Sequence, residues 1–364
     1  MALKHACLVV GITLGGLLTG CGSDPASATS GSGGSGGHPS TTTAGSAAGG
    51  AGATSTGSLT TTSGGTGTSG GSTGSGPSLG GCALFPADNP WNTDISDVSA
   101  FPVDPMSSAY IASIGAEVGL HPDFGAEYNG APNGIPYVIV PASQPKVAID
   151  FVDSPDESDP GPYPVPADAP IEGGPQGDGD RHVLVVQQGS CTLYEMFSSF
   201  PKGSTWEAGS GAVWHLDKNE IRKDEWTSAD AAGLAILPGL VRYDEAVEQG
   251  EINHALRVTV SGAQKAFIYP ASHSDGSAGA DPNAPPMGLR LRLRASFDVS
   301  GFPPPIQVIL RAMKKYGLMV ADSGSNWYIS GAPDPKWDDD MLHELGKVVG
   351  SDFEAVTTGA IHPY

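Results

Sequence analysis

Between residues 22 and 81 the chain consists almost wholly of Gly, Ser, Thr and Ala, and Asp24 is the only formally charged side chain there. Such a segment has too few apolar residues to bury a core, and its composition is typical of a flexible linker. A Gly-rich chain of this length spans about 40 Å on average. We therefore expect the folded part of the protein to lie after this segment.

The first twenty residues have the composition of an export signal. Lys4 and His5 precede the apolar run ACLVVGITLGGLL, which is too short and wrongly flanked for a membrane-spanning helix. The following LLTGC resembles the lipobox of bacterial lipoproteins. That resemblance implies cleavage before Cys21 and lipid attached to its sulfur, with acyl chains that hold the protein on a membrane. An ordinary secretory peptide followed by an incidental cysteine is the alternative.

The chain is thus predicted to have three parts: a lipoprotein signal peptide (1–20), a lipidated cysteine with its linker (21–81), and one globular β-rich domain (82–364). The last part contains no second linker and no internal repeat, which favours a single domain. The net charge of the chain is −21, and this domain carries all of it because Lys4 and Asp24 cancel. Such acidity excludes nucleic acid as a partner and fits an exported soluble module, which we expect to be monomeric.

The cysteine count predicts one disulfide. Cys7 would leave with the signal peptide and Cys21 would be lipidated, so Cys82 and Cys191 remain as a pair. In an oxidising compartment an even pair is expected to be bridged, and two free buried thiols are the alternative.

Short β-branched or aromatic runs bounded by Gly, Pro or Asp dominate the domain, as expected of strands. They lie at 134–140, 146–152, 181–187, 191–197, 211–216, 254–260, 265–271 and 288–299. Helical signals occur only at 107–119, 303–317 and 338–348. Many strands and few helices predict a mostly β fold, namely an antiparallel, jelly-roll-like β-sandwich with a few short helices.

Several runs resemble a family of exported bacterial proteins and lipoproteins: GDRHVLVV, TSADAAGL, HALRVTV and WYISGAPDP. The resemblance extends from NPWNT to SDFEAV and implies export and a single domain. It implies no catalytic residue.

His254 and Arg257 raise the first functional question. His254 is in phase with Leu256 and Val258 on an apolar strand face, whereas Arg257 points the opposite way. A histidine there is either a core residue bonded to a loop or an acid–base group at the edge of a cleft. Arg257 either pairs with an acid or binds a substrate anion.

A second candidate group lies where a long loop meets a strand, in GDGDRH. It offers the acid Asp180, the cation Arg181 and the base His182, with Glu172 earlier in the same loop beside two glycines. A salt bridge that closes the loop, or a Ca²⁺ loop through Asp178 and Asp180, would explain the same residues.

Glu195 is in phase with apolar residues of its strand, so it either pairs with an arginine or has a raised pKa suited to acid catalysis. Asp230, in TSADAAGL, reads as an acid in the first turn of a helix after Thr227 or Ser228. We retain Glu172, Asp180, His182, Glu195 and His254 as candidate catalytic residues.

Arg290, Arg292 and Arg294 alternate with leucines along one strand. They either meet the domain's own carboxylates or form a groove for acidic sugars, which His273 would complete. The candidate substrate-binding residues are Arg181, Arg257, His273 and Arg292. Apart from Ca²⁺, which the run DSPDESD (153–159) could also ligate, the sequence indicates no cofactor and no other metal.

The sequence therefore predicts a surface-tethered, glycan-active protein, either a hydrolase or a lyase that acts on an extracellular polysaccharide or cell-surface glycan. A pair of carboxylates would favour hydrolysis, and a His/Arg set would favour β-elimination. The alternatives are a structural envelope lipoprotein and a non-catalytic glycan-binding or adhesive module. A binding module would expose an aromatic strip drawn from the six tryptophans, Trp91, Trp206, Trp214, Trp226, Trp327 and Trp337.

Overall fold

The computed structural model describes residues 76–364, and the predicted signal peptide, Cys21 and all but the last few linker residues lie outside this range. A short antiparallel hairpin opens the described chain, formed by β1 (Ser78–Leu79) and β2 (Cys82–Ala83). β1 thus falls within the last residues of the predicted linker. No helix among residues 76–364 is both long and apolar enough to cross a membrane.

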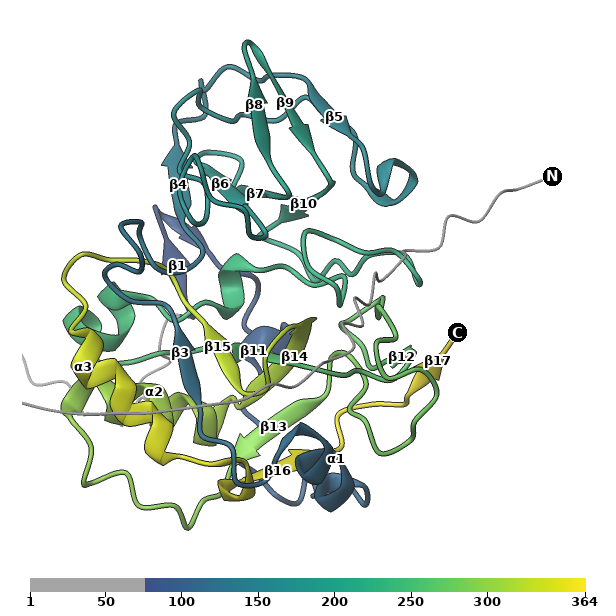
Figure 1. The fold of residues 1–364 in the computed structure, drawn as a ribbon, viewed down its shortest axis with the longest axis vertical. Coiled ribbons are helices and arrows are strands. Elements are labelled where there is room, and N and C mark those ends of the chain that lie inside the picture. Colours follow the sequence, from purple (N-terminus) through teal and green to yellow (C-terminus); the bar gives the residue numbers. More distant parts are fainter. Residues whose placement is uncertain (1–75) are drawn as a thin grey trace, which may run out of the picture. The chain divides into compact units, whose positions relative to one another are not determined.

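The largest sheet has six strands in the order β16–β13–β14–β11–β15–β3 (Figure 1). Their bounds are β3 His121–Asp123, β11 Leu256–Val260, β13 Arg290–Leu293, β14 Leu318–Ser323, β15 Tyr328–Ser330 and β16 Phe353–Val356. Strands β11 and β14 pair in parallel, as do β15 and β3, whereas the other pairs are antiparallel.

A four-stranded sheet has the order β10–β7–β6–β4, and a three-stranded sheet has the order β5–β9–β8. Their bounds are β4 Tyr137–Val140, β5 Ile149–Phe151, β6 Val183–Gln187, β7 Thr192–Phe197, β8 Phe200–Lys202, β9 Thr205–Ala208 and β10 Ser210–His215. A two-stranded ribbon joins β12 (Ala266–Phe267) to β17 (His362–Pro363). Pairs β4–β6 and β5–β9 are parallel.

Helices are few and short. The α-helices are α1 Ser107–Ile114, α2 Pro304–Lys315 and α3 Asp339–Leu342. A π-helical turn spans Asp244–Gln249, and 3₁₀ turns span Pro90–Asn92, Pro155–Glu157, Leu237–Gly239, His343–Lys347 and Gly350–Asp352. Prolines at the start of α2 are compatible with its first turn, where backbone N–H groups lack helical partners, and Gly317 follows its end.

The prediction of a mostly β fold with few helices is confirmed, but the sheets are mixed rather than purely antiparallel. The strand orders are also not those of a clear jelly roll. The reason is visible in β11 and β14, whose residues are nearly all buried on both faces. Strands buried on both faces are typical of parallel pairing and show no alternation that would reveal their neighbours.

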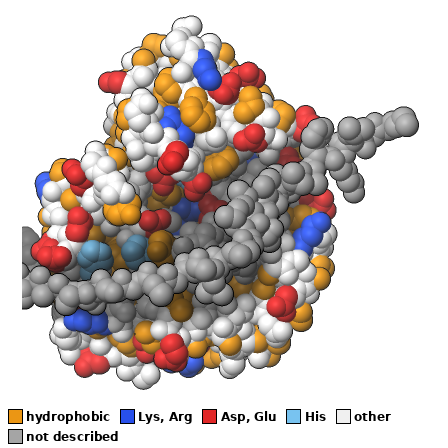
Figure 2. Space-filling model, viewed as in Figure 1, with side chains coloured by type: hydrophobic (Ala, Val, Ile, Leu, Met, Phe, Trp, Pro, Cys, Tyr) orange, Lys and Arg blue, Asp and Glu red, His pale blue; other side chains and the backbone are white. Residues whose placement is uncertain are grey.

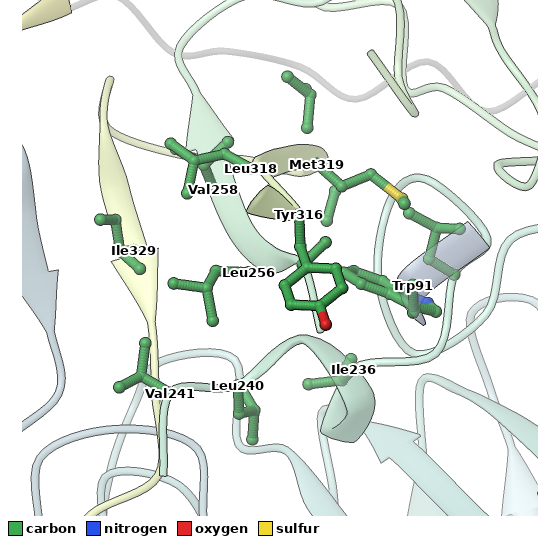
Figure 3. Packing of buried hydrophobic residues seen from close by; sticks show 14 of the residues in the cluster. Trp91, Ile236, Leu240, Val241, Leu256, Val258, Tyr316, Leu318, Met319 and Ile329 are labelled. Carbon is green, nitrogen blue, oxygen red and sulfur yellow. The ribbon is translucent and has the colours of Figure 1, made fainter. Parts of the chain in front are cut away.

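Two apolar cores hold the sheets together. In β6, alternate residues point to opposite faces, so Leu184 and Val186 belong to the larger core and Val183 and Val185 to the smaller one. The larger core includes Trp91, Leu256, Tyr316 and Ile329, drawn in Figure 3. Because the four-stranded sheet has a core on each face, side chains at the ends of its strands are held rigidly.

The predicted disulfide is confirmed. Cys82 and Cys191 are bonded across 109 residues of sequence. The bond ties the opening hairpin to the start of β7.

Candidate functional site

A cavity of about 280 Å³ lies between the ends of the four-stranded sheet and the carboxyl end of β14. Its walls are rich in carboxylates and hydroxyls, with five aspartates, five serines or threonines, and one aromatic residue. The lining residues are Asp153, Ser154, Asp180, Phe197, Ser210, Thr227, Ser228, Ala229, Asp230, Ala231, Asp275, Asp322 and Ser323. Acidic side chains are also frequent on the face drawn in Figure 2, and lysines and arginines are few there.

Strands position four of the lining residues, namely Phe197 at the end of β7, Ser210 at the start of β10, and Asp322 and Ser323 at the end of β14. Asp180 lies in the loop three residues before β6. A polar group at the end of a buried strand is fixed in place by the core behind it. The cavity therefore has side chains from both large sheets in its wall.

Asp230 organises a tight turn rather than the first turn of a helix, which corrects the sequence prediction. Its Oδ1 accepts hydrogen bonds from the backbone N–H groups of Ala232 (3.1 Å) and Leu234 (3.0 Å). Gly233 has a φ of +70°, and a Cβ there would lie 2.2 Å from Oγ of Ser272. This turn consequently requires glycine at position 233.

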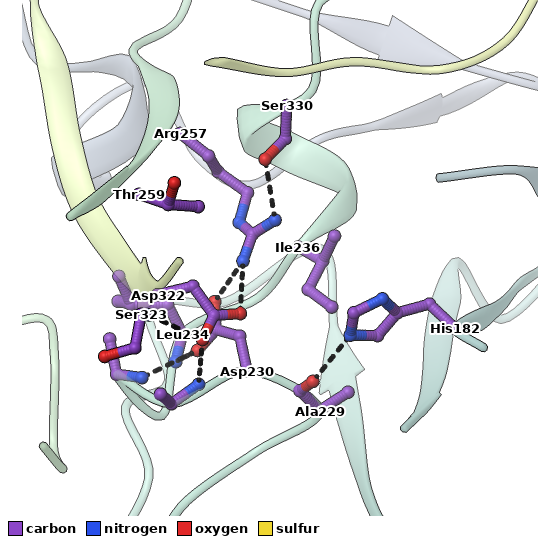
Figure 4. Close-up of polar contacts among 12 residues, drawn as sticks. His182, Ala229, Asp230, Leu234, Ile236, Arg257, Thr259, Asp322, Ser323 and Ser330 are labelled. Atoms are coloured by element: carbon purple, nitrogen blue, oxygen red, sulfur yellow. Dashed lines mark hydrogen bonds and ion pairs between the residues drawn. The ribbon is translucent and has the colours of Figure 1, made fainter. Parts of the chain in front are cut away.

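Arg257 joins the carboxylates of Asp230 and Asp322 (Figure 4). Its Nη2 lies 3.1 Å from Oδ2 of Asp230 and 3.3 Å from Oδ2 of Asp322, and Nη1 donates to Oγ of Ser330 at 3.2 Å. Arg257 is buried and does not line the cavity. It therefore holds the two carboxylates, and the predicted direct contact with substrate does not fit this position.

Asp322 is the member of this pair that meets the cavity. Its side chain is 20% exposed, whereas that of Asp230 is fully buried. Burial, together with the nearby charge of Asp230, raises the pKa of Asp322 to about 7, despite the opposing effect of Arg257. Burial also raises the pKa of Asp230. A carboxyl group that still holds its proton near neutral pH can act as a general acid.

The candidate residues Glu172 and His182 form a pair. Nδ1 of His182 lies 2.6 Å from Oε2 of Glu172, and Nε2 lies 3.0 Å from the carbonyl oxygen of Ala229. Both ring nitrogens thus face acceptors, which favours the doubly protonated imidazolium. Burial opposes the charge, but the carboxylate of Glu172 outweighs it and raises the pKa of His182 to about 9.

This pairing changes the role predicted for both residues. A histidine that keeps its proton at neutral pH cannot serve as a base there. His182 instead donates to Ala229, a residue of the cavity wall, and so fixes the segment that leads to Asp230. Burial alone would raise the pKa of Glu172, but His182 keeps that pKa below its ordinary value.

Asp180 lies in the cavity wall with an exposed side chain. Within residues 76–364 its carboxylate forms no ion pair and no hydrogen bond. Its charge contributes to raising the pKa of Asp322, and it contributes, after burial and Glu172, to raising the pKa of Asp123. Asp180 is therefore a second carboxylate close to Asp322 and open to a ligand.

A wider recess of about 640 Å³ adjoins the cavity along the chain. Its wall contains Asp123, Glu172 and Gly179, and Asp180 follows directly in the wall of the cavity. The remainder of the recess is lined by two loops, 128–134 and 173–178.

Glu195, a predicted catalytic residue, lies outside the cavity and is satisfied by its surroundings. It is fully buried and accepts hydrogen bonds from the backbone N–H groups of Ile236 and Leu237, at 2.9 Å each, and from Nε1 of Trp214, at 3.0 Å. Burial raises its pKa. The carboxylate connects β7 and β10 to the segment 236–237, and it does not line the cavity that contains Asp322.

The contacts of His254 also indicate a structural role. It is fully buried, with Nδ1 2.7 Å from the carbonyl oxygen of Ala255 and Nε2 3.0 Å from Oε2 of Glu245. Arg242 Nη2 lies 2.5 Å from the other oxygen of Glu245. This cluster is not part of the cavity wall, so the structure does not bring His254 to the candidate site.

The remaining predicted binding residues serve the fold. Arg181 is buried, donates to the carbonyl oxygens of Gly177 (2.6 Å) and Ser199 (3.1 Å), and thus closes the loop before β6. Arg292 is buried against Glu354, with Nη2 and Oε1 2.6 Å apart. His273 is half-buried, and its Nδ1 lies 2.6 Å from the carbonyl oxygen of Ala231, behind the cavity wall.

Within residues 76–364 no three His, Cys, Asp or Glu side chains are arranged to hold a metal ion. The Ca²⁺ alternatives at Asp178 with Asp180, and in the run 153–159, therefore have no support from geometry.

Sequence reasoning did not single out Asp322, the aspartate that the cavity depends on. It follows the buried residues Leu318–Ala321 of β14 and precedes Ser323 and Gly324. The available signal was an acidic residue directly after a continuous apolar run, near the carboxyl end of a buried strand. Asp275, another exposed aspartate of the wall, comes from the loop after His273 and gave no such signal.

No protein-family model, no curated protein and no solved structure matches this chain. The function of the cavity is therefore inferred from its own residues.

Proposed function

We propose that the protein is a surface-tethered glycan hydrolase, with Asp322 as the general acid and Asp180 as the second carboxylate. The main support is that one cavity holds two carboxyl groups in different environments. Asp322 is partly buried beside Asp230 with a pKa raised to about 7, whereas Asp180 is exposed and free of ion pairs in the described range. Two carboxyls held in unlike environments are what acid-catalysed glycoside cleavage requires.

The rest of the wall supports a sugar as ligand. Five hydroxyl-bearing residues, four aspartates with accessible side chains and the ring of Phe197 line the cavity. Sugar hydroxyls both donate and accept hydrogen bonds, so hydroxyls and carboxylates match them, and a ring supplies an apolar face.

Hydrolysis is favoured over β-elimination. Elimination from a uronate needs a base and a cation that neutralises the sugar carboxylate. Among residues 76–364 no Lys, Arg or His lines the cavity, and His182 behind its wall is held as an imidazolium by Glu172. An acidic cavity repels uronates, which points to a neutral or cationic glycan.

A binding module that stacks sugars on tryptophans is disfavoured by burial. Trp226 is half-buried, and the other five tryptophans are buried. Trp206 and Trp214, for example, are each only 4% exposed. An aromatic strip made from these residues is therefore not present on the described surface.

The proposal includes a location at the cell envelope or surface. The lipobox-like LLTGC supports lipid on Cys21, and the 21–81 linker would hold the domain away from a membrane at the cell envelope or surface. The Cys82–Cys191 disulfide is what an exported domain is expected to have. Resemblance to exported bacterial proteins supports the same location.

The test is release of new reducing ends across a panel of neutral and amino-sugar polysaccharides by the full chain, by Asp322→Asn and by Asp244→Asn. Asp244 is a matched control, because burial raises its pKa too and Arg242 lies beside it, but it is outside the cavity. We expect turnover to fall about 10²–10⁴-fold in Asp322→Asn, the usual contribution of a general acid, and to stay unchanged in Asp244→Asn. Absence of turnover on the whole panel, or full activity of Asp322→Asn, would refute the proposal.

A further inference from the structure

A second cavity, of about 210 Å³, contains an arginine whose charge is not matched by any acid. Arg290, in β13, is only 3% exposed and lines this cavity. The other lining residues are Pro90, Thr93, Ile95, Phe101, Tyr269, Pro270, Gly288 and Thr358. None of them lines the Asp322 cavity, so the two spaces are separate.

Arg290 is held only by backbone carbonyls. Its Nη1 donates to the carbonyl oxygen of Pro90 at 2.6 Å, and its Nη2 donates to that of Tyr316 at 2.5 Å. Among residues 76–364 no carboxylate lies within ion-pair distance of it. Arg292, two residues further along the same strand, instead has Glu354 as its partner.

This arrangement leaves the guanidinium charge uncompensated. Burial, unopposed by any acid, lowers the pKa of Arg290 to about 9. Keeping an ionised group out of water without a counter-charge is unfavourable unless hydrogen bonds or a ligand replace the lost hydration.

Two buried polar atoms in this cavity also lack partners within the described chain. They are Nε of Arg290, which is a donor, and Oγ1 of Thr358, which can donate. Arg290 and Thr358 both line the cavity, so its polar end combines an uncompensated cation with a hydroxyl-bearing side chain. An anionic group in the cavity would compensate that charge.

The other walls are apolar. Ile95, Phe101 and the prolines Pro90 and Pro270 surround the polar end, and the ring of Tyr269 stands at the exposed side with 39% of its surface accessible. A fully hydrated inorganic ion would gain nothing from such walls. An organic molecule with an apolar body would fill them.

We propose that this cavity binds a small organic carboxylate, which compensates the charge of Arg290 beside the side chain of Thr358 and whose apolar body contacts Phe101 and Ile95. Carboxylate is the group that a guanidinium binds best in geometry as well as charge. A single cation in a chain of net charge −21 also favours a monoanion over a phosphate dianion. The site lies outside the proposed hydrolase cavity, so either proposal can fail alone.

The test is calorimetric titration of the full chain with acetate, hexanoate and benzoate, with benzyl alcohol as the neutral counterpart of benzoate. We expect hexanoate or benzoate to bind more tightly than acetate, because the walls are apolar, and benzyl alcohol to bind at least about tenfold more weakly than benzoate. Binding by none of the three carboxylates would overturn the proposal, as would equal binding of benzyl alcohol.

Three variants locate the site. Arg290→Gln removes the charge, and Thr358→Val removes the hydroxyl with little change in shape; each is expected to weaken binding about tenfold or more. Arg294→Gln is the matched control, because Arg294 follows the same strand but is 49% exposed and pairs with Glu354. If Arg290→Gln does not fold, the affinity of Thr358→Val for the carboxylates tests the assignment alone. Unchanged affinity in Thr358→Val, or an equal loss in Arg294→Gln, would overturn the assignment.

Discussion

Asp230 and Asp322 share one hydrogen-bond donor, because Nη2 of Arg257 lies 3.1 Å from Oδ2 of the first and 3.3 Å from Oδ2 of the second. Two carboxylates this close repel each other, and one cation between them compensates only part of that repulsion. Both aspartates accept backbone N–H groups on Oδ1, Asp230 from Ala232 and Leu234, and Asp322 from Ser323 (2.9 Å) and Ala231 (3.3 Å). Only Asp322 of the two has an exposed side chain, 20% accessible in the cavity wall. The proton that the pair retains is therefore available to a ligand at Asp322.

The rate of hydrolysis is expected to fall on the alkaline side of neutrality. Burial and Asp230 raise the pKa of Asp322 to about 7, and the general acid must be protonated to act. Above that value kcat/KM should decline about tenfold per unit of pH. The pH dependence of kcat/KM measures this, with circular dichroism at each pH to show that the fold is intact. A flat profile between pH 7 and 9 would be inconsistent with Asp322 as the acid.

The His182–Glu172 pair is expected to stabilise the fold below pH 9. The pKa of His182 is raised from 6.5 to about 9, so its contribution is fully present below pH 6.5 and disappears as pH rises through about 9. Relative to His182→Gln, the wild type should gain up to about 3 kcal/mol in its free energy of unfolding below pH 6.5, and little above pH 9.

Urea unfolding of both proteins at the two ends of this range measures the difference. The other titratable groups are present in both proteins, so their contributions to the pH dependence of the free energy of unfolding cancel in the comparison. A gap between wild type and variant that does not change with pH would show that His182 is neutral in the folded state.

Glu195→Gln is expected to reduce stability without changing the chemistry. The carboxylate accepts from two backbone N–H groups and from Trp214, and a glutamine amide would direct its NH₂ group at one of these donors. We expect a loss of about 1–3 kcal/mol in the free energy of unfolding. Denaturant unfolding gives this value, and kcat/KM per folded molecule should match the wild type. A fall in kcat/KM below pH 7, where Asp322 is protonated in both proteins, would instead indicate a role for Glu195 in catalysis.

Removal of the Cys82–Cys191 disulfide is expected to destabilise the domain strongly. The bond closes 109 residues, and constraint of a loop of this length in the unfolded chain contributes roughly 4–5 kcal/mol. The double variant Cys82→Ala/Cys191→Ala and the reduced wild type should lose similar amounts, measured by urea unfolding. Stability equal to that of the oxidised wild type would contradict this.

Local patterns in the sequence identify much of the scaffold. Each of the eight predicted strand segments contains a strand, and each of the three predicted helical segments contains an α-helix. These assignments succeed because period and flanking residues are local properties. Nine strands lie outside the predicted segments: β1, β2, β3, β8, β9, β14, β15, β16 and β17. Eight of them have only two to four residues, whereas the six-residue β14 is mostly buried and shows no alternation of apolar and polar residues.

The site depends on contacts that no local pattern encodes. Glu172 and His182 are ten residues apart, and the sequence presented each as a candidate without indicating that they pair. Arg257 and Asp322, however, meet across 65 residues because β11 and β14 pair in parallel. An arginine in a strand shows a need for an acid but does not identify which acid, and the parallel pairing was not visible in the sequence.

Titration of the aspartate carboxyl carbons by ¹³C NMR, in the wild type and in Asp322→Asn, tests the central claim most directly and needs no substrate. We predict a carboxyl signal in the wild type that titrates near pH 7 and is missing from the variant. If the wild type shows no such signal, and the aspartate carboxyls all titrate near their ordinary pKa of about 4, Asp322 holds no proton at neutral pH and cannot be the acid.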